Sequence, residues 1–212
     1  GVMALQDRER VLTVSDDLPV RMARAVHSGK VRSVYFLTDA DSRRLIEERA
    51  YAVAPDSRLA LMVISDRLSA FDCLWHGETL AGVPGKGACL NAVSAHWFEA
   101  FAQADLGAHH LLEMPHPMLW VVRQAQPIRI EGIARRYLTG SLWRAYARGE
   151  RLVGGVELPD GLAQYERLPA LLFTPSTKGI IDGIAGVAAT DDAPVSPTLL
   201  REHPGAFGLR SS

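Results

Sequence analysis

Lysine is the rare cation of this chain, and its few copies occupy similar places. The sequence contains 23 lysine and arginine residues, of which only three are lysines, namely Lys30, Lys86 and Lys178. Each has a glycine neighbour, so its ammonium group stands beside backbone that can approach a ligand closely. An ammonium point charge combined with bare backbone N–H groups suits phosphate oxygens. Any one of these lysines could be a solvated loop residue, but the three together favour phosphate binding.

The first lysine belongs to the segment Ser28-Gly29-Lys30-Val31-Arg32, which leads into an expected strand. The segment lacks the full Walker spacing and a following helix, so it is not a P-loop. A glycine-rich hairpin turn that covers nucleotide phosphates, as in kinase-like and ATP-grasp-like folds, fits it better. This motif alone is weak evidence for ATP.

Two polar segments follow the next expected strand. Residues 65–72 place Asp66, Arg67, Ser69 and a second carboxylate directly after a buried apolar run, where binding loops commonly lie. A turn with an internal Asp–Arg pair is an equally good interpretation of that segment. Residues 82–87 present Lys86 just before an expected helix, a position that favours anions because the helix N-terminus supplies unpaired N–H groups.

A second phosphate-suited segment lies in the middle of the chain. Arg135, Arg136, Thr139 and Ser141 stand within seven residues and lead into an expected short helix. Two guanidinium groups, hydroxyls and a helix N-terminus form a sound site for a phosphate monoester.

Two further polar segments occur near the C-terminal end. The segment Thr174-Pro175-Ser176-Thr177-Lys178 carries more hydroxyl groups than a plain connection needs. Asp191 and Asp192 could meet a hydrated magnesium ion or an amine, or could form a solvated loop.

Composition limits the class of protein. The 212 residues are 48% hydrophobic and 22% charged, as in ordinary globular proteins, which excludes disordered and collagen-like chains. A net charge of −1 argues against a nucleic-acid partner. We expect no membrane partner and a cytoplasmic location, since no apolar run reaches about 18 residues. Cys73 and Cys89 are too few for a disulfide framework or a structural zinc set, and we expect both to be buried.

Strands are expected at residues 31–37, 59–64, 118–122 and 128–133, which are apolar or rich in β-branched and aromatic residues. Beyond Gly154 we expect long loops with few regular elements. Strands and helices mix without βαβ alternation, which predicts an α+β fold with a largely antiparallel sheet. We place an N-terminal lobe at residues 1–123 and a second, mixed α/β lobe at residues 124–212.

Helices are expected at residues 42–51, from Leu90 onward and at residues 141–148. In the middle helix Val93, Trp97, Phe98 and Phe101 recur at helical spacing and should face the core. Ser141 is expected to cap the last helix and Gly149 to end it.

Five of these segments occur in the order and spacing of the SAICAR synthetase family, which the chain resembles over most of its length. They are residues 28–35, 65–72, 82–87, 135–141 and 173–178. The resemblance implies a ligase of purine biosynthesis that uses ATP and Mg²⁺. Such a ligase joins carboxyaminoimidazole ribonucleotide to L-aspartate through an acyl phosphate, giving SAICAR, ADP and phosphate. Its N-terminal lobe would be an antiparallel, ATP-binding lobe.

The resemblance also implies roles for particular residues. It assigns ATP contacts to Gly29, Lys30, Arg32 and Lys178. Substrate contacts fall to Asp66, Ser69, Arg135 and Ser141, and catalytic positions to Lys86 and Asp192. The metal ligands are not assigned.

Two family motifs that carry magnesium and ATP contacts, Asp-x-Lys-x-Glu-Phe-Gly and Thr-Pro-Asp-Ser-Ser-Arg, are absent from this sequence. We therefore expect a chain that lacks the C-terminal part of the family pattern and has an incomplete second lobe. Two alternatives stay open, namely a non-catalytic nucleotide- or phosphate-binding fragment and a small-molecule kinase of related lobe architecture. A homo-oligomer is compatible with all three.

Overall fold

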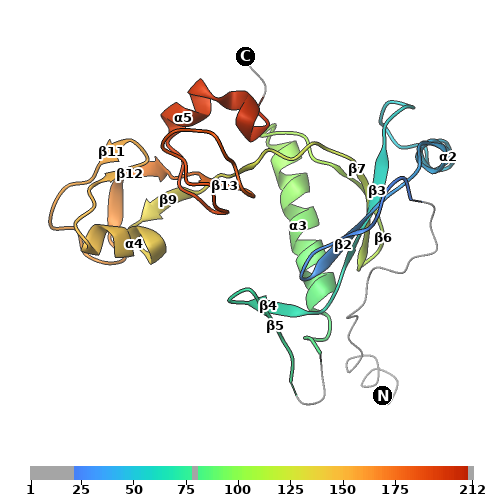
Figure 1. Ribbon diagram of the computed structural model, residues 1–212. Coiled ribbons are helices and arrows are strands. Elements are labelled where there is room, and N and C mark those ends of the chain that lie inside the picture. Colours follow the sequence, from blue (N-terminus) through green and yellow to red (C-terminus); the bar gives the residue numbers. More distant parts are fainter. Residues whose placement is uncertain (1–21, 78–80, 210–212) are drawn as a thin grey trace. The chain divides into compact units, whose positions relative to one another are not determined.

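The computed structural model describes residues 22–77 and 81–209. The chain divides into two compact units, Gly1–Ala125 and Gln126–Ser212. Within the described residues, every pairing between named strands is antiparallel, and helices are mixed among the strands (Figure 1). The prediction of an α+β fold with antiparallel sheets is therefore confirmed.

The first unit is built on a five-stranded sheet with the order β1-β2-β3-β7-β6. Its strands are β1 (His27–Ser28), β2 (Arg32–Phe36), β3 (Leu59–Ile64), β6 (Leu111–His116) and β7 (Leu119–Arg123). The central strand β3 is apolar throughout because both of its faces are covered, and it was predicted at these bounds. Strand β6 was not predicted, because it carries Pro115 and Glu113, which an edge strand tolerates.

Each face of this sheet packs against one helix. Tyr35, Leu61 and Val121 meet Ile46 of α2 (Asp39–Arg49) on one face. The residues that alternate with them form the other face, where Trp120 packs with Phe98 of α3 (Lys86–Gln103). Both helices begin earlier than expected, so Lys86 is the first residue of α3.

The predicted orientation of α3 is wrong. The side chains of Leu90, Val93, Trp97 and Phe101 are 40–53% exposed, and only Phe98 of the expected set packs on the sheet. The helix instead turns the row containing Asn91 inward, and the buried Asn91 amide donates to the carbonyl oxygen of Pro117 over 3.0 Å. Because α3 is apolar around most of its circumference, its periodicity does not decide which side is buried.

The prediction that both cysteines are buried is also wrong, since Cys73 and Cys89 are exposed. Cys73 begins β5 (Cys73–Trp75), whose residues are all exposed and which, among the described strands, pairs with β4 (Leu68–Ala70) in a short hairpin. Cys89 lies in the first turns of α3.

The described strands of the second unit form two-stranded antiparallel sheets. β8 (Ile130–Glu131) pairs with β13 (Ser176–Thr177), and β9 (Ala134–Tyr137) pairs with β12 (Arg167–Phe173). A small hairpin joins β10 (Leu152–Val153) to β11 (Val156–Glu157). The strand expected at residues 128–133 is thus only two residues long. The seven-residue β12 is a regular element that the expectation of long loops beyond Gly154 did not include. The register shift in its pairing with β9 interrupts the alternation of apolar and polar residues that would have indicated a strand.

The helices of the second unit are α4 (Gly140–Ala147), α5 (Pro197–Glu202) and a 3-10 turn at Pro204–Phe207. Thr139 occupies the N-cap of α4, so the prediction that Ser141 caps this helix is wrong, and Ser141 lies in its first turn. Leu142 and Tyr146 of α4 pack with Leu138 and Leu172 in one core cluster. A second cluster gathers around the fully buried Phe207.

Candidate functional sites

The first candidate site begins at the glycine turn between β1 and β2. The amide of Gly29 donates to the carbonyl oxygen of Arg32 over 2.7 Å, and a Cβ at Gly29 would lie 3.2 Å from that oxygen. Glycine therefore suits this turn. At its tip, the Lys30 ammonium forms an ion pair with Asp72. A hydrogen bond from Lys30 and its positive charge hold the pKa of the Asp72 carboxyl below its usual range.

The loop after β3 is tied to this turn. Ser65 donates to the carbonyl oxygen of Val31 through its amide (2.8 Å) and its hydroxyl (3.0 Å). The Arg67 guanidinium then donates through Nε to Ser65 Oγ (3.0 Å) and through Nη2 to the Gly29 carbonyl oxygen (3.3 Å). Two segments predicted to carry site residues thus lie side by side.

The same loop also holds the start of α3. Asp66 is buried, and its Oδ1 accepts from the amide of Gly87 over 2.8 Å. Lys86 Nζ donates to the carbonyl oxygen of Arg67 over 3.1 Å. A Cβ at Gly82 would lie 2.4 Å from the Asp66 carbonyl oxygen, so only glycine permits this close approach. Arg67 thus links the glycine turn that carries Lys30 to the segments that carry Asp66 and Lys86, while Ser69 lies farther along in β4, opposite Leu74.

Arg32 lies on the α3 side of the sheet. Its guanidinium carbon is 5.4 Å from the centroid of the Trp120 ring, and burial lowers the pKa of Arg32. The pKa of His110, which has an edge-to-face contact with Trp120, is lowered by burial and then by the charges of His109 and Arg32. The indole Nε1 of Trp120 is buried without a hydrogen-bond partner. This face therefore combines a partly desolvated cation with a buried indole N–H that has no hydrogen-bond partner.

The second candidate site is a cavity of about 730 Å³ in the second unit. Arg135 lies on β9 in its wall, where Nε donates to Thr174 Oγ1 over 2.8 Å and Nη2 donates to Ser141 Oγ over 3.1 Å. The cavity therefore joins the predicted residues Arg135 and Ser141 to the hydroxyl-rich segment that begins at Thr174. A fixed guanidinium beside the first turn of a helix is suited to binding a phosphate monoester.

Of the other predicted residues, one lines this cavity and two are not in its described lining. Asp192 lines it, although it is distant from Arg135 in sequence. Arg136 alternates with Arg135 on β9 and is not part of the described lining, so only one of the two expected guanidinium groups lies there. Lys178 is exposed and also lies outside that lining, and its amide donates to the carbonyl oxygen of Arg129 over 2.9 Å.

Sequence reasoning missed two charged residues of the cavity, Arg148 and Glu150. Both line it, and they form an ion pair of 3.1 Å at the C-terminal end of α4. The positive φ of 97° at Gly149 turns the chain at this point. The helical spacing of Ser141, Ala145 and Arg148 was a signal for Arg148, whereas the glycine after the expected helix predicts a turn but not its direction.

The described residues contain no group of three or more His, Cys, Asp or Glu side chains placed to hold a metal ion. Asp191 Oδ1 accepts from the amides of Gly179 (2.7 Å) and Asp192 (3.0 Å), so this carboxylate stabilises its own turn. None of the helices in the part of the chain that the structure describes has the length and apolar character needed to span a membrane.

Comparisons with known proteins give a consistent result. The family model described as SAICAR synthetase matches residues 25–182. Phosphoribosylaminoimidazole-succinocarboxamide synthase of Shewanella oneidensis is 56% identical over 208 residues, which cover 98% of this chain and 56% of the relative. The enzyme of the same name from Vibrio campbellii is 56% identical over 204 residues, covering 96% of this chain and 56% of the relative. The chain thus spans little more than half the length of these relatives.

A solved structure supports the fold. The SAICAR-synthase from Saccharomyces cerevisiae, complexed with SAICAR, superposes with a TM-score of 0.62 at 24% identity. The superposition covers 90% of this chain and 58% of the yeast chain. This likeness supports the fold, and the family model matches well over half of the residues, so the chain belongs to the SAICAR synthetase family.

Proposed function

We propose that this protein serves the ATP-dependent joining of carboxyaminoimidazole ribonucleotide to L-aspartate, which yields SAICAR, ADP and phosphate. The curated relatives carry the name of that synthase, and the substrate is a phosphate monoester. The observation that carries the proposal is the Arg135 guanidinium, fixed by Thr174 and Ser141 in a cavity at the first turn of α4. In this proposal Arg135 and Ser141 bind the ribonucleotide phosphate.

The chemistry requires activation of a carboxylate, because a free carboxylate is a poor acyl donor. Phosphoryl transfer from ATP converts it to an acyl phosphate, and the aspartate amine then displaces phosphate to form the amide. The protein contributes mainly positioning and charge neutralisation. The glycine turn with Lys30 and the partly desolvated Arg32 fit the ATP phosphates, and we also assign Lys178 to ATP.

The remaining roles follow the family resemblance. Lys86 and Asp192 are proposed as catalytic residues, and Asp66 and Ser69 as substrate contacts. Because Asp66 is buried and bonded to the amide of Gly87, we infer that it acts by holding the start of α3. Mg²⁺ accompanies ATP in this proposal, and its ligands are not assigned among the described residues. The reaction belongs to purine biosynthesis, which fits a cytoplasmic protein.

The test measures ADP release by the 212-residue chain in the presence of ATP, Mg²⁺, carboxyaminoimidazole ribonucleotide and aspartate, with each omitted in turn. We expect release that requires all four. Release without aspartate would instead indicate a kinase. Binding of a phosphate monoester is measured in parallel, because it tests the Arg135 site without requiring turnover. No binding and no release would contradict the proposal.

A further inference from the structure

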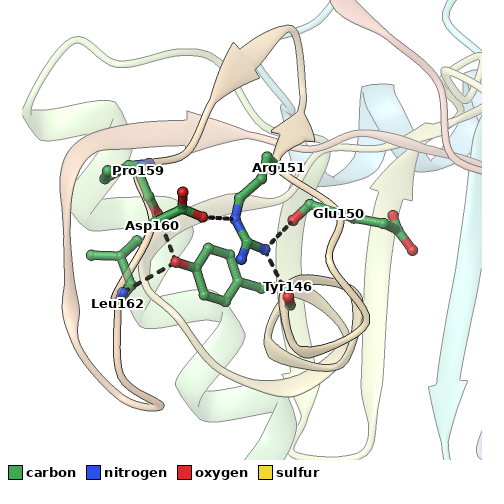
Figure 2. Close-up of polar contacts among 6 residues, drawn as sticks. All are labelled: Tyr146, Glu150, Arg151, Pro159, Asp160 and Leu162. Carbon is green, nitrogen blue, oxygen red and sulfur yellow. Dashed lines mark hydrogen bonds and ion pairs between the residues drawn. The ribbon is translucent and has the colours of Figure 1, made fainter.

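Arg151 lies behind one wall of the second-unit cavity and is held by several contacts. Its Nε donates to Asp160 Oδ1 over 2.7 Å, and its Nη1 donates to the carbonyl oxygens of Tyr146 (2.9 Å) and Glu150 (3.2 Å) (Figure 2). Its guanidinium carbon lies 3.9 Å from the centroid of the Tyr146 ring. Arg151 therefore makes polar contacts in the plane of its guanidinium and an aromatic contact through its face.

Tyr146 extends this arrangement to the next loop. Its hydroxyl donates to the carbonyl oxygen of Pro159 over 2.6 Å and accepts from the amide of Leu162 over 3.1 Å. The side chain is buried and stacks on Trp143, one helical turn earlier. We call Arg151, Tyr146 and Asp160 the Arg151 clamp. It fixes the turn after α4 against the loop at residues 159–162.

The turn fixed in this way carries part of the cavity wall. Arg148, Glu150 and Leu152 line the cavity, whereas Arg151 between them does not. The amide of Leu158 donates to the carbonyl oxygen of Arg151 over 2.8 Å, which adds one backbone tie. The Arg148–Glu150 ion pair is largely exposed and contributes little to order, because solvent screens such pairs. The amides of Gly149 and Glu150 also donate to the carbonyl oxygens of Tyr146 (3.0 Å) and Ala145 (3.1 Å), and the clamp adds the side-chain contacts that tie this wall to the loop at residues 159–162.

The same cavity contains the proposed phosphate contact Arg135, so Arg148 supplies a second cation to it. We propose that Arg151 is a positioning residue that orients Arg148 toward the anionic group bound at Arg135. The proposal rests on the proposed function, in which that group is a phosphate monoester. Arg148 pairs weakly with Glu150, so a phosphate bound at Arg135 can compete for the same donors.

The test is a double-mutant cycle on the 212-residue chain, with ribose 5-phosphate as the probe and affinity measured by calorimetry. Arg148→Ala and Arg151→Ala should each weaken binding about tenfold, the expected loss of one hydrogen bond to a charged group. The double variant should bind no more weakly than Arg148→Ala alone, because Arg151 acts through Arg148. Arg144→Ala, on the exposed side of the same helix, is the matched control and should bind like the unmodified chain.

A purely structural role gives a different pattern. If the two losses multiply to about a hundredfold, or if Arg151→Ala binds normally, the positioning role is wrong. Should Arg151→Ala fail to fold by circular dichroism, Arg151→Lys replaces it in the cycle. Lysine keeps the charge near Asp160 but does not reproduce the planar fork, so the same weakening and the same non-additivity are expected.

The Arg135→Ala variant separates this inference from the proposed function. Loss of binding in Arg135→Ala with normal binding in Arg151→Ala overturns only the positioning role. If the unmodified chain does not bind ribose 5-phosphate, or if Arg135→Ala binds it equally well, both the phosphate site and the positioning role are wrong.

Discussion

Arg135 and Ser141 are joined by a hydrogen bond of 3.1 Å between guanidinium Nη2 and hydroxyl Oγ, which links strand β9 to the first turn of α4. The bond spans only six residues of chain, so the strand, the turn and the helix form one local unit. The guanidinium is thereby fixed before any ligand arrives, which lowers the entropic cost of binding.

Replacing Arg135 by lysine should weaken binding of a phosphate monoester at least about tenfold, because one ammonium does not reproduce the fork that also meets Thr174 and Ser141. Calorimetry with ribose 5-phosphate measures the change. Arg136→Lys, on the other side of β9, is the matched control. Equal effects of the two substitutions would contradict the assignment of Arg135.

Gly82→Ala should lower the free energy of unfolding by about 2 kcal/mol or more, since overpacking against backbone leaves little room for relaxation. The added Cβ would lie 2.4 Å from the Asp66 carbonyl oxygen. Urea denaturation gives the difference. Gly205→Ala is the control, because a Cβ there has no neighbour within 4 Å, and it should change stability by less than about 0.5 kcal/mol. Similar losses at both glycines would argue against the close approach.

Acid should destabilise the first unit through His110. Its pKa in the folded chain is lowered by burial and by the positive charges of His109 and Arg32, from an ordinary value of 6.5. As the pH falls below this value, the unfolded chain takes up a proton that the folded chain resists, so the free energy of unfolding decreases. Urea denaturation at pH 7.5 and 5.5 should show a smaller decrease for His110→Gln than for the unmodified chain. An identical decrease in both would contradict this origin.

Trp120 of the sheet and Trp97 of α3 should differ in their contribution to stability. Trp120 is 2% exposed, and Trp120→Leu should cost about 3 kcal/mol because it leaves a cavity in the core. Trp97 is 53% exposed, and Trp97→Gln should cost less than about 1 kcal/mol. Urea denaturation of both variants tests the orientation of α3. A larger loss for Trp97→Gln would mean that its side of the helix is covered.

The phosphate-suited segment at Arg135 could be predicted because its geometry is local. Strand alternation places Arg135 on one face of β9, and the glycine at 140 leads directly into the helix that carries Ser141. The hydroxyl-rich segment at Thr174 was also noted, but its contact with Arg135 depends on the pairing of β9 with β12. The spacing of residues within one segment does not predict which distant strand that segment pairs with.

The position of Glu150 and the orientation of α3 could not be predicted for a different reason. Arg148 shares a face of α4 with Ser141, but the chain beyond it reverses at Gly149, and this reversal depends on packing that only the folded chain defines. In α3, Asn91 and Phe98 face the sheet while Val93, Trp97 and Phe101 point outward. Hydrophobicity alone does not decide between these two sides.

The contacts of Arg67 limit how the glycine turn between β1 and β2 can move. Its guanidinium holds the turn at Gly29, and its own carbonyl oxygen accepts from Lys86 at the start of α3. The glycine turn therefore does not open independently, because opening it also breaks hydrogen bonds of the loop after β3, which is bonded to the first turn of α3. In hydrogen exchange these three segments should form one cooperative unit with a shared opening free energy. Arg67→Ala removes the guanidinium contact with Gly29 but keeps the carbonyl oxygen that accepts from Lys86, so it should lower the protection of the glycine turn and leave that of α3 unchanged.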